Sequence, residues 1–346
     1  GGQWLDPTGH SSRALLNPAD GVTALAEFTE SSAADIDQAV AAAAAAFPSW
    51  RDMPVVRRCR ILFHCKELLE QRSDEIARCM VAENGKTLVE AEGEVRRGIE
   101  VVEFAAGMPS MAKGDFIENI ATRVDGYIYR EPLGVVAGAC PFNFPAMIPM
   151  WMFPVAIACG NTFVLKPSDK CPMTGTLVAG IMHEGGVPDG VLSVVHGGGD
   201  AVQHLVTHPQ VEAISFVGST PVAQVVWRSA AEVGKRVQAL GGAKNYIVVM
   251  PDADIEETAA AVIGSTYGCA GERCMASSVL VPVAGGDELV DRVIELAQAL
   301  KLGDGLADDT GMGPVITAEH KQRVEEYIGI GLSEGATLRL DGREAE

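Results

Sequence analysis

One cysteine stands in a setting that favours nucleophilic chemistry. Cys274 lies in the segment Gly271-Glu-Arg-Cys-Met-Ala276, just past a glycine-bearing turn and next to Arg273. A thiol attacks as its thiolate, which an adjacent cation or a helix N-terminus favours. Cys274 is therefore a candidate nucleophile. The other cysteines are interpreted as small buried apolar residues, and they are Cys59, Cys65, Cys79, Cys140, Cys159, Cys171 and Cys269.

Two segments have the residues to hold a phosphorylated ligand. Residues 213–220 read as a strand, a tight turn at Gly218 and a helix start, where backbone N–H groups can bind a pyrophosphate. Lys166-Pro-Ser-Asp169 directly follows a buried apolar strand, so its side chains could hold ribose hydroxyls. An ordinary strand-to-helix turn and ordinary strand-end solvation explain the same residues, so both interpretations stay open at this point.

A pair of histidines has the spacing of a zinc site. His204 and His208 lie four residues apart on one face of a predicted helix. The segment lacks the glutamate of the H-E-x-x-H motif, and no third ligand lies nearby in the sequence. The sequence therefore predicts no metal.

The elements that must position these residues follow an α/β pattern. After residue 135, short apolar strands alternate with helices, which indicates a doubly wound parallel sheet that helices cover on both faces. The predicted strands are 135–139, 162–165, 191–195, 213–217, 236–240, 246–250, 277–283 and 337–340. The predicted helices are 34–50, 57–71, 74–83, 88–107, 174–183, 200–206, 221–232, 255–267, 287–300 and 317–334, so the first hundred residues are mostly helical.

Two segments depart from this alternation. Residues 132–165 carry no charged side chain and are long enough to span a bilayer. Their four interior prolines instead predict a buried strand, a proline-rich turn, a buried helix and a second buried strand. Further on, Asp125-Gly126 separates the runs 117–124 and 127–130 and predicts a type I′ hairpin that extends from the body as an arm.

Composition limits the partners. The chain has 346 residues, with 27 Lys+Arg against 46 Asp+Glu and a formal net charge of −19. At about 150 residues per domain, this length predicts roughly two domains. The negative charge argues against nucleic acid and anionic membranes as partners and favours a small molecule or another protein. The cysteines form no C-x-x-C pair and no secretory signal pattern opens the chain, which predicts free thiols in the cytoplasm.

Taken together, five motifs identify a family resemblance. Pro141-Phe-Asn-Phe-Pro145, Lys166-Pro-Ser-Asp169, Phe216-Val-Gly-Ser-Thr220, Leu240-Gly-Gly242 and Gly271-Glu-Arg-Cys274, in this order, resemble the aldehyde dehydrogenase superfamily. The tracts 134–138, 141–154, 235–238 and 242–245 resemble most its CoA-acylating methylmalonate-semialdehyde or malonate-semialdehyde dehydrogenases. Ordered motifs over essentially the whole chain are far more specific than any one of them.

The resemblance implies roles for individual residues. Cys274 would attack an aldehyde to give a thiohemiacetal, and Asn143 with the Cys274 backbone N–H would donate to the oxyanion. Hydride transfer to NAD would leave a thioester on Cys274. The residues implied to contact NAD are Cys140, Phe142, Lys166, Asp169, Lys170, Gly218, Ser219 and Gly241. Asp169 replaces the commoner glutamate, and its carboxylate favours NAD over NADP because it repels a 2′-phosphate.

One departure from the family pattern bears on the second half of the reaction. Hydrolytic members carry a glutamate directly before Leu-Gly-Gly as the base that activates water, and here that position is Ala239. A CoA thiolate needs no such base, so CoA is the expected acyl acceptor and propionyl-CoA or acetyl-CoA the product. A hydrolytic semialdehyde dehydrogenase is the alternative.

Two arginines match positions that bind the substrate carboxylate in the semialdehyde enzymes. Arg97 falls on the matching helix, and Arg273 directly precedes the nucleophile. A guanidinium suits a carboxylate because it can donate two parallel hydrogen bonds. A solvated helix charge is the alternative interpretation of Arg97. The sequence does not choose between methylmalonate and malonate semialdehyde.

The resemblance also implies a division into domains. An NAD-binding domain would comprise residues 1–116 and 132–242, and residues 117–131 would form the arm of a homodimer or homotetramer. Residues 243–346 would form an incomplete catalytic domain, because the Glu-Ile-Phe-Gly-Pro-like motif of the family does not occur after Arg343. A non-catalytic NAD-binding or assembly fragment is therefore a further alternative.

Overall fold

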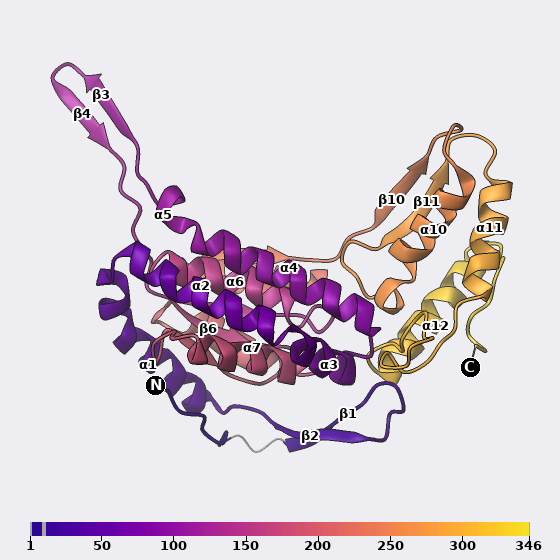
Figure 1. The fold of residues 1–346 in the computed structure, drawn as a ribbon, viewed down its shortest axis with the longest axis horizontal. Helices are drawn as coiled ribbons and strands as arrows, with labels where there is room; N and C mark the ends of the chain where they lie inside the picture. The colour runs from indigo at the N-terminus through magenta and orange to yellow at the C-terminus, as the bar shows by residue number, and fades with distance from the viewer. Residues whose placement is uncertain (1, 9–11, 346) are drawn as a thin grey trace. The chain divides into compact units, whose positions relative to one another are not determined.

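The computed structural model describes residues 2–8 and 12–345, which form two compact units (Figure 1). Unit 1 comprises Gly1–Ala14, Glu27–Ala77 and Glu92–Gly241, and unit 2 comprises Leu15–Ala26, Arg78–Ala91 and Gly242–Glu346. The division predicted from the sequence assigned the two shorter segments of unit 2 to the NAD-binding domain. The functional names of these domains stay predictions.

Unit 1 is built on a five-stranded parallel sheet. Its strands are β5 (Val135–Ala139), β6 (Thr162–Lys166), β7 (Leu192–Val194), β8 (Val211–Val217) and β9 (Arg236–Leu240). Their order across the sheet is β7-β6-β5-β8-β9, which confirms the predicted doubly wound parallel sheet. The order reverses between β5 and β8, and doubly wound folds bind ligands at that point, outside the carboxyl ends of the strands.

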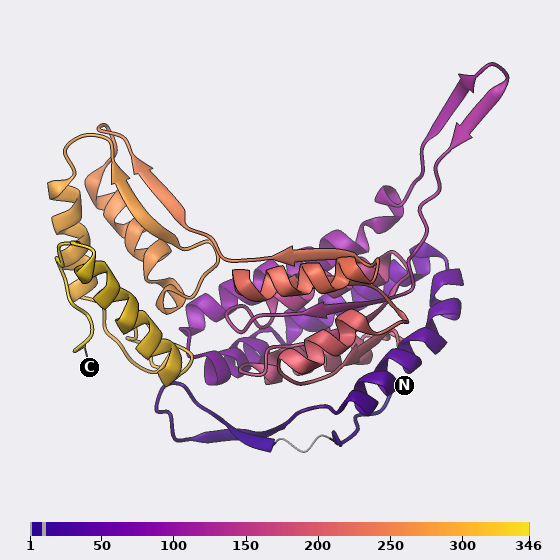
Figure 2. The ribbon, with the colours of Figure 1, turned by 180° about the vertical axis from the view of Figure 1, so that it is seen from behind.

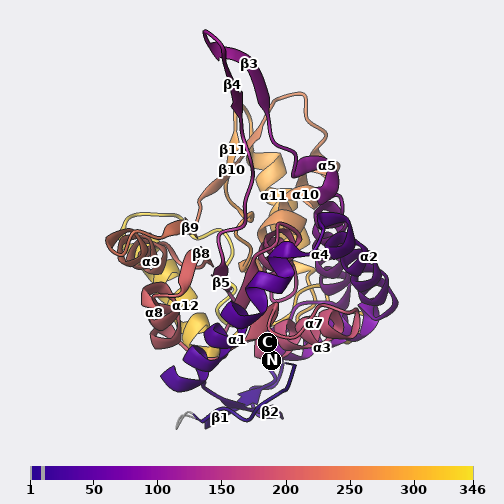
Figure 3. The ribbon, with the colours of Figure 1, turned by 90° about the vertical axis from the view of Figure 1, so that its left-hand side faces the viewer.

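Helices cover both faces of this sheet. On one face lie α6 (Met147–Ala158) and α7 (Pro172–Glu184), with α2 (Val55–Gln71) and α4 (Leu88–Ala106) on their outer side (Figure 1). On the other face lie α1 (Ala33–Asp52), α8 (Gly199–Thr207) and α9 (Thr220–Glu232), as Figures 2 and 3 show. The core of this second face joins apolar side chains from all three helices and from the strands, among them Val40, Leu205, Val226, Ala137 and Ile214. Two shorter helices are α5 (Met108–Met111), which lies in unit 1, and α3 (Ser73–Asn84), which begins in unit 1 and ends in unit 2.

The uncharged tract of residues 132–165 forms the predicted strand, turn, helix and second strand. Its helix, α6, packs on β5 and β6, and its N-cap residue, Ala146, makes no side-chain cap. The Glu94 side chain from α4 accepts the N–H groups of Ala146 at 2.9 Å and Met147 at 3.0 Å. Glu94 is 2% exposed, so a buried carboxylate caps the helix that follows Asn143. Among the described residues, no helix is both long enough and apolar enough to cross a membrane.

A hairpin projects from unit 1, but its turn differs from the prediction (Figure 1). β3 (Phe116–Ala121) pairs antiparallel with β4 (Val124–Tyr127). Ala121 is in register with Val124, so the turn falls on residues 122 and 123, and Arg123 has φ 63°. The predicted turn at Asp125-Gly126 is therefore wrong. Both residues lie in β4, where the Asp125 carboxylate accepts the backbone N–H of Asn119 at 3.0 Å.

A second hairpin, near the N-terminus, was not predicted from the sequence. β1 (Ser12–Leu16) pairs with β2 (Ala24–Thr29) in a two-stranded sheet, inside a stretch that was predicted to be mostly helical. Asp20 stabilises the connection, because its carboxylate accepts the N–H groups of Val22 and Thr23, both at 2.9 Å.

Unit 2 carries a smaller parallel pair. β10 (Asn245–Val249) pairs with β11 (Ser277–Pro282), and α10 (Ile255–Thr266) packs on β11 and on α11 (Asp287–Gln298). A short turn with non-helical backbone at Gly268–Gly271 follows α10, and the last described helix is α12 (Ala318–Ser333). The strand predicted at 337–340 is wrong, because no described strand pairs with these residues.

We expect Glu94→Ala to lower the free energy of unfolding of unit 1 by about 2 kcal/mol, because two buried N–H groups at the start of α6 lose their acceptor. Tryptophan fluorescence during urea denaturation measures this, since all four tryptophans lie in unit 1. Glu100→Ala, an exposed glutamate on the same helix, is the control and should change the midpoint little. Equal effects of the two substitutions would contradict the capping role.

Candidate functional site

The residues that the sequence analysis assigned to a dinucleotide meet along one edge of the unit 1 sheet. Ala139 is in register with both Lys166 and Phe216, and Phe216 is in register with Ala239. Four neighbouring strands therefore end at one level, beside the reversal between β5 and β8. The candidates that lie at or just after these strand ends are Cys140, Lys166, Asp169, Gly218, Ser219 and Gly241.

Two backbone hydrogen bonds fix the loops at this edge. The N–H of Cys140 donates to the Lys166 carbonyl at 3.0 Å, and the N–H of Gly218 donates to the Leu240 carbonyl at 3.1 Å. A Cβ on Gly218 would lie 2.5 Å from the Phe216 ring, so the turn requires glycine there. Ser219 is the N-cap of α9 but makes no side-chain cap, which leaves this helix N-terminus suited to an anion such as a pyrophosphate.

Charged side chains flank the same edge. Lys166 is 5% exposed, and its Nζ donates to the Gly197 carbonyl at 2.7 Å. Burial lowers the pKa of Lys166, and the Asp169 carboxylate opposes that change. Lys170 lies with its Nζ 5.1 Å from the centre of the Phe142 ring, a cation–π contact that joins two further candidates.

His196, which follows β7, is a buried group that the motif search did not assign. Its Nε2 lies 3.4 Å from the Thr176 hydroxyl, and its ring packs edge-on against Phe28 at 5.7 Å between centres. The Nδ1 atom is buried and has no hydrogen-bond partner among the described residues. Burial, assisted by the charge of Lys166, lowers the pKa of His196 to about 4. A neutral imidazole therefore stands beside the lysine at neutral pH.

In unit 2, Cys274 lies on a constrained loop between α10 and β11. Three consecutive residues upstream have left-handed backbone, with φ 49° at Cys269, 53° at Ala270 and 76° at Gly271. The Asn245 side chain donates to the carbonyls of Cys274 at 3.1 Å and Ala276 at 3.0 Å. Cys274 is partly exposed, so the loop presents a thiol whose flanking peptide groups are fixed.

Glu90, on the first turn of α4, holds the same loop. Its Oε1 accepts the N–H of Cys269 at 2.7 Å and the Nη2 of Arg273 at 2.9 Å. The Arg273 guanidinium also donates to the Gly264 carbonyl and to the Cys269 sulfur. The predicted substrate ligand Arg273 is thus anchored within unit 2. Sequence reasoning missed Glu90, although Thr87-x-x-Glu90 has the pattern of a capping box.

Two other candidates belong to unit 1. Arg97 is exposed on α4 and has no hydrogen bond or ion pair with any residue in 2–8 or 12–345. Asn143 is partly buried in the loop that joins β5 to α6. The cap that Glu94 provides therefore fixes the C-terminal end of the Asn143 loop.

Comparison with known proteins decides the family. The sequence model of the aldehyde dehydrogenase family matches residues 4–346. The chain belongs to the aldehyde dehydrogenase family. Malonate-semialdehyde dehydrogenase 1 of Geobacillus thermodenitrificans is 52% identical over 345 residues, which cover 99% of this chain and 71% of that protein.

Solved structures confirm the aldehyde dehydrogenase fold. Methylmalonate-semialdehyde dehydrogenase from Oceanimonas doudoroffii has a TM-score of 0.96 and 46% identity, covering 100% of this chain and 71% of that chain. A Sinorhizobium meliloti protein named as a methylmalonate-semialdehyde dehydrogenase, solved in complex with NAD, has a TM-score of 0.96 and 43% identity. The match covers 100% of this chain and 70% of that chain.

Most of the other cysteines of this chain are buried, and buried thiols are unreactive. Burial raises the pKa of Cys140 to about 12, and its Sγ lies 3.8 Å from the Met152 sulfur. The predicted burial of all seven remaining cysteines holds for five of them and is wrong for Cys79 and Cys159, which are partly exposed.

The two histidines with zinc-like spacing form a different contact. The Asp37 Oδ1 lies 2.6 Å from the Nε2 of His204 and 3.4 Å from the Nε2 of His208. Among residues 2–8 and 12–345, no group of three or more His, Cys, Asp or Glu side chains is arranged to hold a metal ion.

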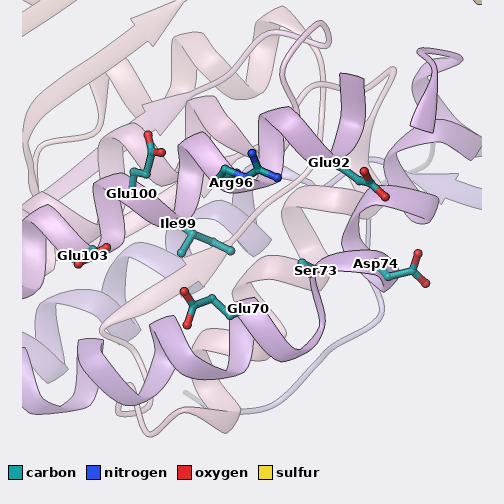
Figure 4. A pocket seen from close by; sticks show the side chains of 8 residues that line it. All are labelled: Glu70, Ser73, Asp74, Glu92, Arg96, Ile99, Glu100 and Glu103. Atoms are coloured by element: carbon teal, nitrogen blue, oxygen red, sulfur yellow. The ribbon is translucent and has the colours of Figure 1, made fainter. Parts of the chain in front are cut away.

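A cavity of about 320 Å³ in unit 1 contains none of the predicted site residues. Figure 4 shows Glu92, Arg96 and Glu100 following one another along α4, and Glu70 on α2. The remaining lining residues are Ser73, Asp74, Ile99 and Glu103. Its acidic lining makes this cavity unsuitable for an anionic substrate or a dinucleotide.

Acid should destabilise unit 1 through His196. An unfolded histidine takes up a proton as the pH falls through 6.5, whereas folded His196 resists protonation until about pH 4. The free energy of unfolding should therefore fall across that window, by up to about 3 kcal/mol. Urea denaturation followed by tryptophan fluorescence should give a shallower fall for His196→Gln. His64→Gln, at an exposed histidine, should keep the wild-type slope, and a His196→Gln slope equal to wild type would contradict the assignment.

Proposed function

We propose that this chain carries the cofactor-binding and nucleophilic machinery of an NAD-dependent semialdehyde dehydrogenase that passes its acyl group to CoA. The observation that carries the proposal is the loop around Cys274, where a partly exposed thiol stands between peptide groups held by Asn245 and Glu90. The semialdehyde substrate is supported by the names of the relatives, which match this chain along its whole length.

The edge of the unit 1 sheet fits NAD. Turns that require glycine and an uncapped helix N-terminus suit a pyrophosphate, and Lys166 with Asp169 suits ribose hydroxyls. The assigned contacts are the backbone at Cys140 and Phe142, the side chains of Lys166, Asp169 and Lys170, and the backbone at Gly218, Ser219 and Gly241. When bound, NAD supplies the acceptor for the hydride that leaves the substrate.

The chain's own residues perform the acyl chemistry. The Cys274 thiolate adds to the aldehyde carbon, while the Asn143 amide and the Cys274 backbone N–H donate to the oxygen that gains negative charge. Loss of hydride leaves a thioester on Cys274. A CoA thiolate then attacks the thioester carbonyl and displaces Cys274, and products of propionyl-CoA or acetyl-CoA size require loss of the substrate carboxylate as CO₂.

Acyl transfer to CoA is favoured over hydrolysis because the nearby carboxylates are already engaged and Ala239 supplies no base. Ala239 packs against the core of the sheet and offers no base. In unit 2, Glu90 accepts from the Cys269 N–H and Arg273, and the Glu272 Oε1 accepts the N–H of Ile316 at 3.2 Å. Both carboxylates that brace the loop are thus engaged as structural acceptors, which disfavours activation of water.

Assembly is the remaining part of the proposal. The arm formed by β3 and β4 exposes apolar side chains along both strands, including Phe116, Ile120 and Tyr127. Exposed apolar strands favour pairing with another chain, which supports a homodimer or homotetramer.

The CoA requirement gives the direct test. With malonate or methylmalonate semialdehyde, the chain should form NADH continuously when CoA is present, and in its absence should stop after one equivalent with an acyl adduct on Cys274. NADH absorbance and intact mass measure the two outcomes, and Cys274→Ala should abolish both. Equal steady rates with and without CoA would support hydrolysis instead. NAD binding without NADH or adduct would favour a non-catalytic fragment.

Arg97→Ala should raise KM for either semialdehyde by about tenfold or more, because a guanidinium–carboxylate contact is lost. The KM for propanal, which has no carboxylate, should stay unchanged. Arg96→Ala is the matched control, because Arg96 is the neighbouring arginine and lines the acidic cavity. Similar changes in KM for semialdehyde and propanal would remove Arg97 from the substrate site.

A further inference from the structure

Arg13 reaches the proposed ribose site from a part of the chain that no motif marked. It lies on β1, and its Nη2 donates to the Asp169 carboxylate at 2.9 Å and to the Asp169 carbonyl at 2.8 Å. One nitrogen thus binds the side chain and the backbone of the same residue. Arg13 therefore sets both the direction and the effective charge of the carboxylate that follows β6.

The position of Arg13 is itself fixed by packing. Its guanidinium carbon lies 5.2 Å from the centre of the Phe28 ring, a cation–π contact. Phe28 is 5% exposed and packs edge-on against His196. The His196 N–H donates to the Ser31 hydroxyl at 3.0 Å, and the Ser31 N–H donates to the His196 carbonyl at 3.1 Å. The start of β1 and the end of β2 are therefore attached to the segments that follow β6 and β7, which holds Arg13 in place.

This arrangement changes the electrostatics expected from Asp169 alone. A lone carboxylate near the adenosine ribose repels a 2′-phosphate, whereas an arginine at this place accommodates one. The side chains of Arg13 and Asp169 are 49% and 35% exposed, so both are accessible to a ligand. Their ion pair cancels much of the carboxylate charge, and Lys166 adds a further positive charge at the same edge.

We propose that Arg13 determines how strongly this site discriminates between NAD and its 2′-phosphorylated counterpart. Paired with Asp169, it keeps the penalty on a 2′-phosphate small while leaving the carboxylate oriented toward the ribose. Loss of Arg13 leaves an unpaired carboxylate and sharpens the preference for the 2′-hydroxyl. This inference rests on the cofactor site assigned under the proposed function.

The test uses two probes that differ only at the 2′ position, 5′-AMP and 2′,5′-ADP. Calorimetry on the whole chain gives the ratio of the Kd for 2′,5′-ADP to the Kd for 5′-AMP. Arg13→Gln should raise this ratio about tenfold, and Asp169→Asn should lower it below wild type. The double variant should return to within about twofold of wild type, because both charges of the pair are gone.

Control variants distinguish an effect of the Arg13 charge from an effect on folding. Arg13→Lys should restore most of the wild-type ratio, and the effect of Arg13→Gln should shrink at high salt. Arg51→Gln, which breaks a 2.8 Å surface ion pair with Asp52 in the same unit, should leave the ratio unchanged. If Arg13→Gln fails to fold, Asp169→Asn and Arg13→Lys decide the question.

Each failure has a distinct meaning. If the wild-type chain binds neither 5′-AMP nor NAD, the assigned cofactor site is wrong and this inference falls with it. If 5′-AMP binds and the ratio for folded Arg13→Gln stays within about twofold of wild type, the role of Arg13 is overturned and the cofactor site stands. If Asp169→Asn leaves the ratio of the two Kd values unchanged, the proposed role of Arg13 is also overturned.

Discussion

The parallel sheet of unit 1 imposes the constraint on which the proposed cofactor site depends. Because all five strands run the same way, the segments that follow them emerge at one edge. The register aligns Ala139, Lys166, Phe216 and Ala239, so the candidates at and after these positions meet at one edge although they are spread over a hundred positions of sequence. The reversal of strand order then separates the helices beside β5 and β8 to opposite faces, which leaves the edge accessible to a ligand.

Two glutamates of α4, the buried Glu94 and the partly buried Glu90, fix the two loops that carry the proposed chemistry. On α4, Glu94 caps α6 after the Asn143 loop, and Glu90 binds the Cys269 backbone and Arg273 ahead of Cys274. Neither glutamate touches a reacting atom in the proposed mechanism. Each replaces a missing local partner, because a helix start without a side-chain cap and a loop with left-handed backbone both leave N–H groups to satisfy.

The sequence was sufficient for elements whose signals are local. Apolar runs bounded by turns predicted β5 and β9 to the residue, and the ordered motifs identified the family. The sequence was insufficient where a partner distant in the chain determines the local structure or the contacts of a side chain. The turn of the β3–β4 hairpin lies at residues 122 and 123 and not at Asp125, because pairing with β3 sets its position. Residues 337–340 form no strand, because no described strand pairs with them. Arg13 was missed because its partner lies 156 residues away.

The left-handed residues before Cys274 have a consequence for how variation in this chain should be interpreted. Outside glycine, such backbone costs about 1–2 kcal/mol per residue, so Cys269 and Ala270 hold it only because their surroundings enforce it. The geometry of the proposed nucleophile is thus set by residues remote in sequence, Glu90 and Asn245. A substitution at Glu90 or Asn245 would therefore lower activity as a catalytic substitution does, although neither side chain contacts the substrate in the proposed mechanism. A β-branched residue at position 270 would have the same effect by disturbing the loop directly.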